Sequence, residues 1–254
     1  MEPAYVGIDV ACAKKKALPI SVCVQRGGKL TPLPLREAAR PPRGGGNALA
    51  LGADWRDDFA AQTESYLRSV EKAFSVKIER IALDAPSEPC GNNLTRRRAE
   101  HALDERRISC FATPTVAQVE AMIRKARAHL TAGGPENRLP HANQVWMLVG
   151  FALFEHLGQT WSCLEVYPQA TVALLGCGKL HKSGGAGLSN QTKAVGQRLG
   201  WAEAEFERAL MQSGFGQLHD QLDAYLAAWV ASLDEAEREP LGSPPSDVIW
   251  VPRL

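Results

Sequence analysis

The sequence predicts an α/β protein with a mixed sheet flanked by helices. Short β-rich runs open the chain, an apolar strand follows a long helical segment, and helices and strands continue to alternate after it. Strands separated by helical patterns indicate crossover connections within one sheet. Of the 254 residues, 45% are apolar and 22% are charged, the balance of a globular protein with a real core. We expect one domain over residues 1–254.

The first part of the chain is expected to form a β-meander. Its three β-rich runs are residues 5–11, 19–25 and 29–35. Gly27 and Gly28 supply the turn between the last two runs. The sequence PPRGGG at residues 41–46 is expected to be an irregular loop on the surface, because neither a helix nor a central strand tolerates so much proline and glycine.

A βαβ crossover is expected next. Residues 55–73 carry apolar side chains at helical spacing, and residues 78–84 form a compact apolar strand. Residues 93–107 are then predicted to be a helix with many charges.

The second half is expected to be mainly helical. Two helices at residues 116–130 and 143–157 flank a connection rich in glycine and proline, so we expect insertions at about residues 36–55 and 115–158. A strand at residues 161–167 stops at Pro168. The remaining segments are expected to be a short helix at 170–175, a flexible stretch at 176–187, helices at 191–199, 203–211 and 217–233, and a final strand at 247–252.

Charge and cysteine content exclude several classes of protein. The 29 Lys and Arg residues balance 28 Asp and Glu residues, so a histone-like or ribosomal binder is excluded and any attraction to polyanions must be local. The six cysteines lack the paired spacing of a zinc site or a disulfide framework. The N-terminus has no basic signal-peptide region, and the longest apolar run falls short of the roughly 20 residues of a membrane helix. We expect a cytoplasmic protein without membrane contact.

Two aspartates lie in strands where a carboxylate needs an explanation. Asp9 is flanked by Ile8 and Val10, and such a carboxylate is costly unless it reaches an exposed edge or a cation. Asp84 ends an apolar strand just before Pro86, at the edge where open α/β sheets place their sites. A single aspartate at a strand end is more often a cap or turn former. The pair favours a site.

Three further carboxylates are candidates for the same edge. Asp223 falls on the flank of the apolar stripe of the helix at 217–233, and Glu165 is flanked by apolar residues in a later strand. Asp220 lies one turn before Asp223, further toward solvent, and either joins the cluster or serves only as a first-turn charge.

Carboxylates that converge repel one another unless a divalent cation neutralises them. Oxygen ligands indicate Mg²⁺ or Mn²⁺, and a pair of such ions can activate water and stabilise the leaving oxygen of a phosphodiester. We therefore expect a hydrolase in which Asp9, Asp84 and Asp223 hold metal and Glu165 or Asp220 completes the set. The alternative is that these carboxylates are structural.

Several motifs, in a specific order from residue 5 to residue 252, resemble one family. They are GIDVA, LDAP, the pair Arg97 and Glu100 before ISCFATP, EVYPQA, HKS, HDQLDAYLAAWVASL and DVIWVP. Together they resemble the DUF429 family, regarded as predicted nucleases of the ribonuclease H-like fold. The resemblance implies a ribonuclease H-like sheet with helical insertions, DNA or RNA as substrate, and acidic positions at Asp9, Asp84, Glu165, Asp220 and Asp223. The turn after Asp84 and residues 41–46 depart from the family pattern beside the expected cleft.

Basic residues near the expected site are candidates for substrate binding. Lys14 follows the Asp9 strand and Arg97 follows the Asp84 strand, although either can simply solvate a turn or helix face. The resemblance also singles out the position of Arg97. Lys179, His181 and Lys182 lie in a glycine-rich loop that could close over a substrate. Trp146, in contrast, is expected in the core rather than as a stacking platform for bases.

Two other functions stay open. An actin-like or sugar-kinase-like phosphotransferase has a similar opening strand but needs glycine-rich phosphate hairpins in two duplicated halves, and the chain shows no duplication. A non-catalytic binding module of the same fold would keep the carboxylates for structure alone.

Overall fold

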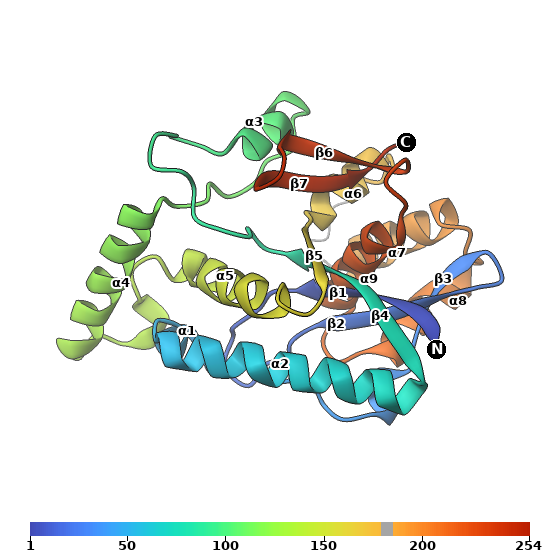
Figure 1. Ribbon diagram of the computed structural model, residues 1–254, viewed down its shortest axis with the longest axis horizontal. Coiled ribbons are helices and arrows are strands. Elements are labelled where there is room, and N and C mark those ends of the chain that lie inside the picture. The colour runs from blue at the N-terminus through green and yellow to red at the C-terminus, as the bar shows by residue number, and fades with distance from the viewer. Residues whose placement is uncertain (179–184) are drawn as a thin grey trace.

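The computed structural model describes residues 1–178 and 185–254 and contains a five-stranded mixed sheet flanked by helices (Figure 1). This confirms the predicted α/β class. The strand order is β3-β2-β1-β4-β5. The strands are β1 (Glu2–Asp9), β2 (Ile20–Arg26), β3 (Lys29–Pro32), β4 (Val76–Asp84) and β5 (Ser162–Glu165).

The opening meander and the crossover are both present. β1 pairs with β2 and β2 with β3, in each case antiparallel, and Gly27 and Gly28 turn the chain with positive φ angles of 58° and 76°. β4 returns parallel to β1 after a helix, and β5 pairs parallel to β4. The carboxyl ends of β1, β4 and β5 therefore meet at one edge of the sheet.

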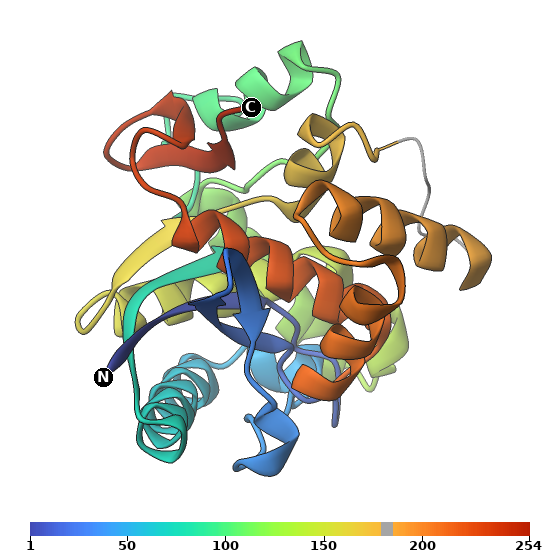
Figure 2. The same ribbon diagram turned by 90° about the vertical axis from the view of Figure 1, so that its right-hand side faces the viewer.

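Helices cover both faces of this sheet, and Figure 2 shows α2 and α9 on opposite sides of it. One side carries α1 (Asn47–Ala50), α2 (Ala53–Phe74), α4 (Val116–Thr131) and α5 (Val145–Leu157). The other side carries α7 (Gly185–Arg198), α8 (Glu203–Ser213) and α9 (Leu218–Ser232). Three short 3-10 turns lie at Leu35–Glu37, Glu136–Arg138 and Ala142–Gln144.

The two faces of β1 differ in what they bury. Ala4, Val6 and Ile8 belong to the main core with α2 and α5, whereas Tyr5 packs toward α9. This is the alternation of side chains expected along a strand. Gly7 therefore lies on the α9 face of β1.

The packing of α9 on β1 depends on Gly7. A Cβ atom added there would overlap the carbonyl oxygen of Ala224 and the amide nitrogen of Ala228, both in the α9 backbone. Because β1, β2 and β4 contact one side of α9 and other helices contact the opposite side, α9 is buried on nearly all sides. The sequence indicated only one buried stripe for this helix.

A small layer lies beyond the carboxyl ends of the strands, as Figure 1 shows. It contains the antiparallel hairpin of β6 (Arg238–Ser243) and β7 (Asp247–Pro252) with α3 (Arg98–Glu105) and α6 (Pro168–Leu174). A bridge between Val166 and Trp250 joins this hairpin to the main sheet. The strand β6 was missed in the sequence because Pro240 and Gly242 interrupt it.

Two expectations are wrong, one about the loop at residues 41–46 and one about the start of the charged helix. Residues 41–46 do not run over the surface, since Pro41, Pro42 and Gly44 are buried and Gly44 lies against the backbone of Cys12. The charged helix begins at Arg98 rather than at residue 93, because the Asp247 carboxylate accepts the backbone N–H of Arg98 at 2.7 Å and so caps the helix from outside.

All six cysteines are free thiols. Within the described residues, no helix has the length and apolar character needed to cross a membrane. Half of the stretch expected to be flexible, residues 179–184, lies outside the described residues.

Replacing Gly7 by alanine is expected to cost about 3 kcal/mol of unfolding free energy, because the new methyl group would meet backbone atoms that cannot move aside. Urea unfolding of the variant measures this. Gly91→Ala is the control, since its added Cβ meets only the Leu94 side chain at 3.8 Å. Equal stability of the two variants would contradict the close packing of α9 on β1.

Candidate active site

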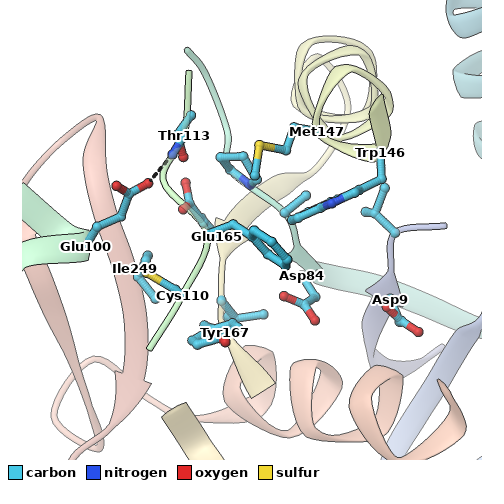
Figure 3. Close-up of a pocket in the computed structure, with 15 residues that line it drawn as sticks. Asp9, Asp84, Glu100, Cys110, Thr113, Trp146, Met147, Glu165, Tyr167 and Ile249 are labelled. Carbon is cyan, nitrogen blue, oxygen red and sulfur yellow. Dashed lines mark hydrogen bonds between the residues drawn. The ribbon is translucent and has the colours of Figure 1, made fainter. Parts of the chain in front are cut away.

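Asp9 and Asp84 are the last residues of β1 and β4 and lie directly opposite each other in the register of the two parallel strands. Residues opposite each other in a sheet point to the same face. Because Asp9 is two residues beyond Gly7, this face is the one that α9 covers. Both side chains are partly exposed, and Figure 3 shows their carboxylates directed to the same side. The adjacency expected from the sequence is therefore present.

Asp223 reaches this region from α9. It lies one turn before Ala227, whose methyl group faces Gly7. Burial raises the pKa of Tyr167 to about 12, and the negative charges of Asp84 and Asp223 contribute to the rise. The helical position of Asp223 therefore places it on the side of α9 that packs on the sheet face carrying Asp9 and Asp84.

Asp220 is buried at the N-terminus of α9, not turned toward solvent as the sequence indicated. Its Oδ1 atom accepts from Lys16 Nζ at 2.8 Å, and His219 Nε2 lies 3.0 Å from the same oxygen. Its Oδ2 atom accepts the backbone N–H of Gln217 at 3.2 Å, within a capping box. Of the two roles left open for Asp220, these contacts are those of a first-turn charge.

Glu165 lies on the opposite face of the sheet from Asp9 and Asp84. It is opposite Leu83, not Asp84, in the register of β4 and β5, so its side chain points away from α9. Figure 3 shows this divergence between Glu165 and Asp84. Its Oε2 atom accepts the backbone N–H of Ser87 at 2.8 Å. Glu165 therefore lines the same pocket as Asp9 and Asp84 but from the other face of the sheet, and its role as a metal ligand stays a prediction.

Arg97 forms a buried two-bond ion pair with Glu165. Its Nη1 and Nη2 atoms donate to the two carboxylate oxygens at 2.7 and 2.9 Å, and only 3% of its side chain is exposed. Burial raises the pKa of the Glu165 carboxyl, and the charge of Arg97 opposes that rise. Burial lowers the pKa of Arg97, but the charges of Glu165 and Asp247 outweigh it and hold that pKa above its ordinary value.

Asp247 extends this ion pair into a network. It accepts from Arg97 Nε at 3.2 Å and from the backbone N–H groups of Arg98 and Ala99 at 2.7 and 3.2 Å. The network therefore joins β5, the start of α3 and the start of β7. Arg97, expected to meet the substrate, faces this network instead.

Glu100, the partner of Arg97 in the R-x-x-E pattern, supports a different loop. Its Oε1 atom accepts the backbone N–H of Thr113 at 2.8 Å, and its Oε2 atom lies 3.7 Å from Arg96 Nε. The side chain is only 2% exposed. The sequence analysis assigned no role to Glu100. The available signal was its position in a short helix next to the apolar residues Ala99 and Leu103, which are buried.

Asp9 and Asp84 line a pocket of about 290 Å³, called here the carboxylate pocket. The residues that line it are Asp9, Val10, Asp84, Ala85, Pro86, Glu100, Cys110, Phe111, Thr113, Trp146, Met147, Glu165, Val166, Tyr167 and Ile249. Among these described residues there are four acids, three aromatic side chains and no Lys or Arg. The aromatic residues in this wall were not predicted as part of a site.

Of the basic residues predicted to bind substrate, the two that the structure describes, Lys14 and Arg97, do not line this pocket. Lys14 is exposed on the loop after β1 and lines a neighbouring pocket. Lys179, His181 and Lys182 lie outside the described residues, so their predicted role stays a prediction.

Asp9 and Asp84 fit a Mg²⁺ or Mn²⁺ ion through their chemistry. They offer carboxylate oxygens from adjacent positions on one face. Over residues 1–178 and 185–254, no group of three or more His, Cys, Asp or Glu side chains is placed to hold an ion. Mg²⁺ is nevertheless often bound by one or two carboxylates, with water and substrate phosphates completing its shell. The pair suits that kind of site rather than a cage made entirely of protein ligands.

Comparison with protein families gives one match. The model of the family described as "Protein of unknown function (DUF429)" matches residues 42–246. Asp84, Glu165 and Asp223 lie inside this segment, and Asp9 lies before it. Comparison with curated proteins gave no match, and comparison with solved structures gave none.

Arg97→Met is expected to cost about 3 to 5 kcal/mol of unfolding free energy, because it leaves the Glu165 carboxylate buried without its cation. Denaturant unfolding measures this. The double variant with Glu165→Leu and Arg97→Met is expected to lose less unfolding free energy than the sum of the losses of the two single variants, because the two residues are coupled. Additive losses, together with a weaker salt dependence of nucleic-acid binding by Arg97→Met, would instead assign Arg97 to the substrate.

Proposed function

Because the chain belongs to the DUF429 family, for which no function is described, we propose its activity from the geometry of the site. We propose a divalent-metal-dependent phosphodiester hydrolase that acts on nucleic acid at the carboxylate pocket. The observation that carries this proposal is the register of β1 and β4, which sets Asp9 and Asp84 side by side at the mouth of a pocket.

The surroundings of this pair support a reaction with a charged substrate. Asp9 and Asp84 would hold Mg²⁺ or Mn²⁺ through their carboxylate oxygens, and Asp223 adds negative charge from α9. Bound there, the cation would supply activation of water and neutralisation of the leaving oxygen. No Lys or Arg is among the described residues that line the pocket. A bound metal ion would therefore supply the positive charge that attracts a phosphate to the pocket.

The side chains around the pair would position the substrate. Tyr167 donates its hydroxyl hydrogen to the backbone carbonyl of Ser109 at 2.8 Å, which fixes its ring in the wall of the pocket that Asp84 also lines. The Arg97 and Glu165 pair holds the end of β5 and the small layer in place on the other side of the sheet. Arg97 and Glu165 are positioning residues in this proposal.

We also infer that the sheet is of the ribonuclease H-like type. A meander followed by a parallel crossover places the first and fourth strands side by side, as that fold does for its paired carboxylates. A phosphotransferase of the actin-like or sugar-kinase-like type would need a second, duplicated half, and the described residues contain a single five-stranded sheet and one separate hairpin.

Asp84→Asn is expected to abolish metal-dependent cleavage of nucleic acid and to remove most of the stabilisation by Mn²⁺. If the ion binds only the folded chain, a concentration of about 100 times its dissociation constant stabilises the wild type by roughly 2.7 kcal/mol. Gel assays on labelled DNA and RNA, with melting curves in Mn²⁺ and in chelator, measure the two effects. Asp9→Asn should behave in the same way.

Asp58→Asn is the matched control, because Asp58 is an exposed acid on α2. It should retain both the cleavage and the shift by Mn²⁺. If Mn²⁺ shifts neither the wild type nor the control, and Asp84→Asn is strongly destabilised in chelator, then Asp84 is a structural acceptor and the proposal fails.

A further inference from the structure

A second pocket adjoins the carboxylate pocket. The second has a volume of about 580 Å³ and is lined by Val10, Ala11, Cys12, Ala13, Lys14, Gly46, Asn47, Glu136, Asn137, Ala142 and Trp146. We call it the Lys14 pocket. Val10 and Trp146 line both pockets, so these two residues form the wall between them.

Trp146 is held in a fixed position at this wall. It lies in the first turn of α5, and its Nε1 atom donates to the backbone carbonyl of Asn143 at 2.9 Å. Its ring packs on the main core and is only partly buried. Figure 3 shows it extending from α5 toward the strand ends that carry Asp84 and Asp9. Trp146 thus packs on the core, as the sequence indicated, and also lines both pockets.

The carboxylate pocket suits an unpaired nucleotide better than a duplex. Asp9 and Asp84 lie within a recess of about 290 Å³, which is near the lower limit for a small-ligand site. A base enters a recess of this kind only from single-stranded substrate or after its nucleotide has been flipped out of the helix, because a stacked and paired base cannot be reached. Trp146 and Tyr167 line this recess, and Phe111 at its rim is 59% exposed. Aromatic faces of this kind stack on bases without regard to sequence.

The Lys14 pocket supplies the positive charge that the carboxylate pocket lacks. Lys14 is the one Lys or Arg among the described residues that line either pocket. Glu136 is the acid in this second pocket, and its Oε1 atom accepts the backbone N–H of Ala48 at 3.1 Å. The exposed ammonium group of Lys14 is thus placed to contact a phosphate one step along a strand from Asp9 and Asp84.

We propose that the two pockets form one path for single-stranded nucleic acid, with a base stacked on Trp146 and a backbone phosphate held by Lys14. This inference names the form of the substrate and so rests on the proposed function. The path runs from the carboxylate pocket over Val10 and Trp146 into the Lys14 pocket.

The test is binding of a fluorescein-labelled 12-nucleotide strand, as DNA and as RNA, compared with its duplex, by fluorescence anisotropy. It uses the Asp84→Asn protein in EDTA, so that no cleavage consumes the probe and binding is judged apart from hydrolysis. We expect the single strand to bind at least about fivefold tighter than the duplex and to quench Trp146 fluorescence. The duplex cannot stack a base on Trp146, and one such stacked base changes the affinity by at least about fivefold.

Variants of the two pocket residues sharpen the test. Trp146→Leu should weaken single-strand binding at least about fivefold, and Trp146→Phe should retain most of it because a ring remains. Lys14→Ala should weaken binding and lower the slope of log affinity against log salt by about 1. The controls are Trp250→Leu and Lys72→Ala, whose side chains line neither pocket. Both controls should bind like the parent.

Equal binding of strand and duplex would overturn the path, as would unchanged binding by Trp146→Leu or by Lys14→Ala. If cleavage is absent from the wild type but the expected binding pattern is found, the path stands and the hydrolase proposal fails. If the wild type cleaves duplex and Trp146→Leu cleaves equally well, the hydrolase stands and the path fails.

Discussion

The contact between α9 and β1 at Gly7 is the constraint on which the candidate site depends. Only a residue without a side chain lets the backbone around Ala224 and Ala228 lie against the strand. Asp223, one turn further toward the N-terminus of α9, lies on the side of the helix that packs on the face carrying Asp9 and Asp84. A wider separation of helix and sheet would leave the strand aspartates facing open solvent.

The acidic residues that the sequence grouped together have separate tasks in the structure. Asp9, Asp84 and Asp223 share one face of the sheet, whereas Glu165 holds Arg97 on the other face and Asp220 caps α9 while paired with Lys16. A buried arginine with two carboxylate partners ties the small layer to the sheet, and its charge is paired with Glu165 and Asp247. The pocket then combines acids with aromatic walls, which suits a metal ion together with a base.

Local sequence patterns were sufficient for the meander, the crossover and the adjacency of Asp9 and Asp84, because strand alternation and proline breaks are local signals. The face of Glu165 could not be predicted, since it depends on a one-residue offset in the register of β4 and β5. Nor could the inward turn of Arg97, which depends on Asp247, 150 residues away. Trp146 reads as core from its apolar neighbours, and only tertiary structure shows that it also lines two pockets.

The central claim is that Asp9 and Asp84 together hold a divalent cation. A crystal structure of the protein soaked in Mn²⁺, with the ion located by its anomalous scattering, tests this most directly. We predict an anomalous peak at the carboxyl ends of β1 and β4, within roughly 2.0 to 2.6 Å of a carboxylate oxygen from each aspartate. A fully soaked crystal with no peak there, or with manganese bound only at other carboxylates, would contradict the account.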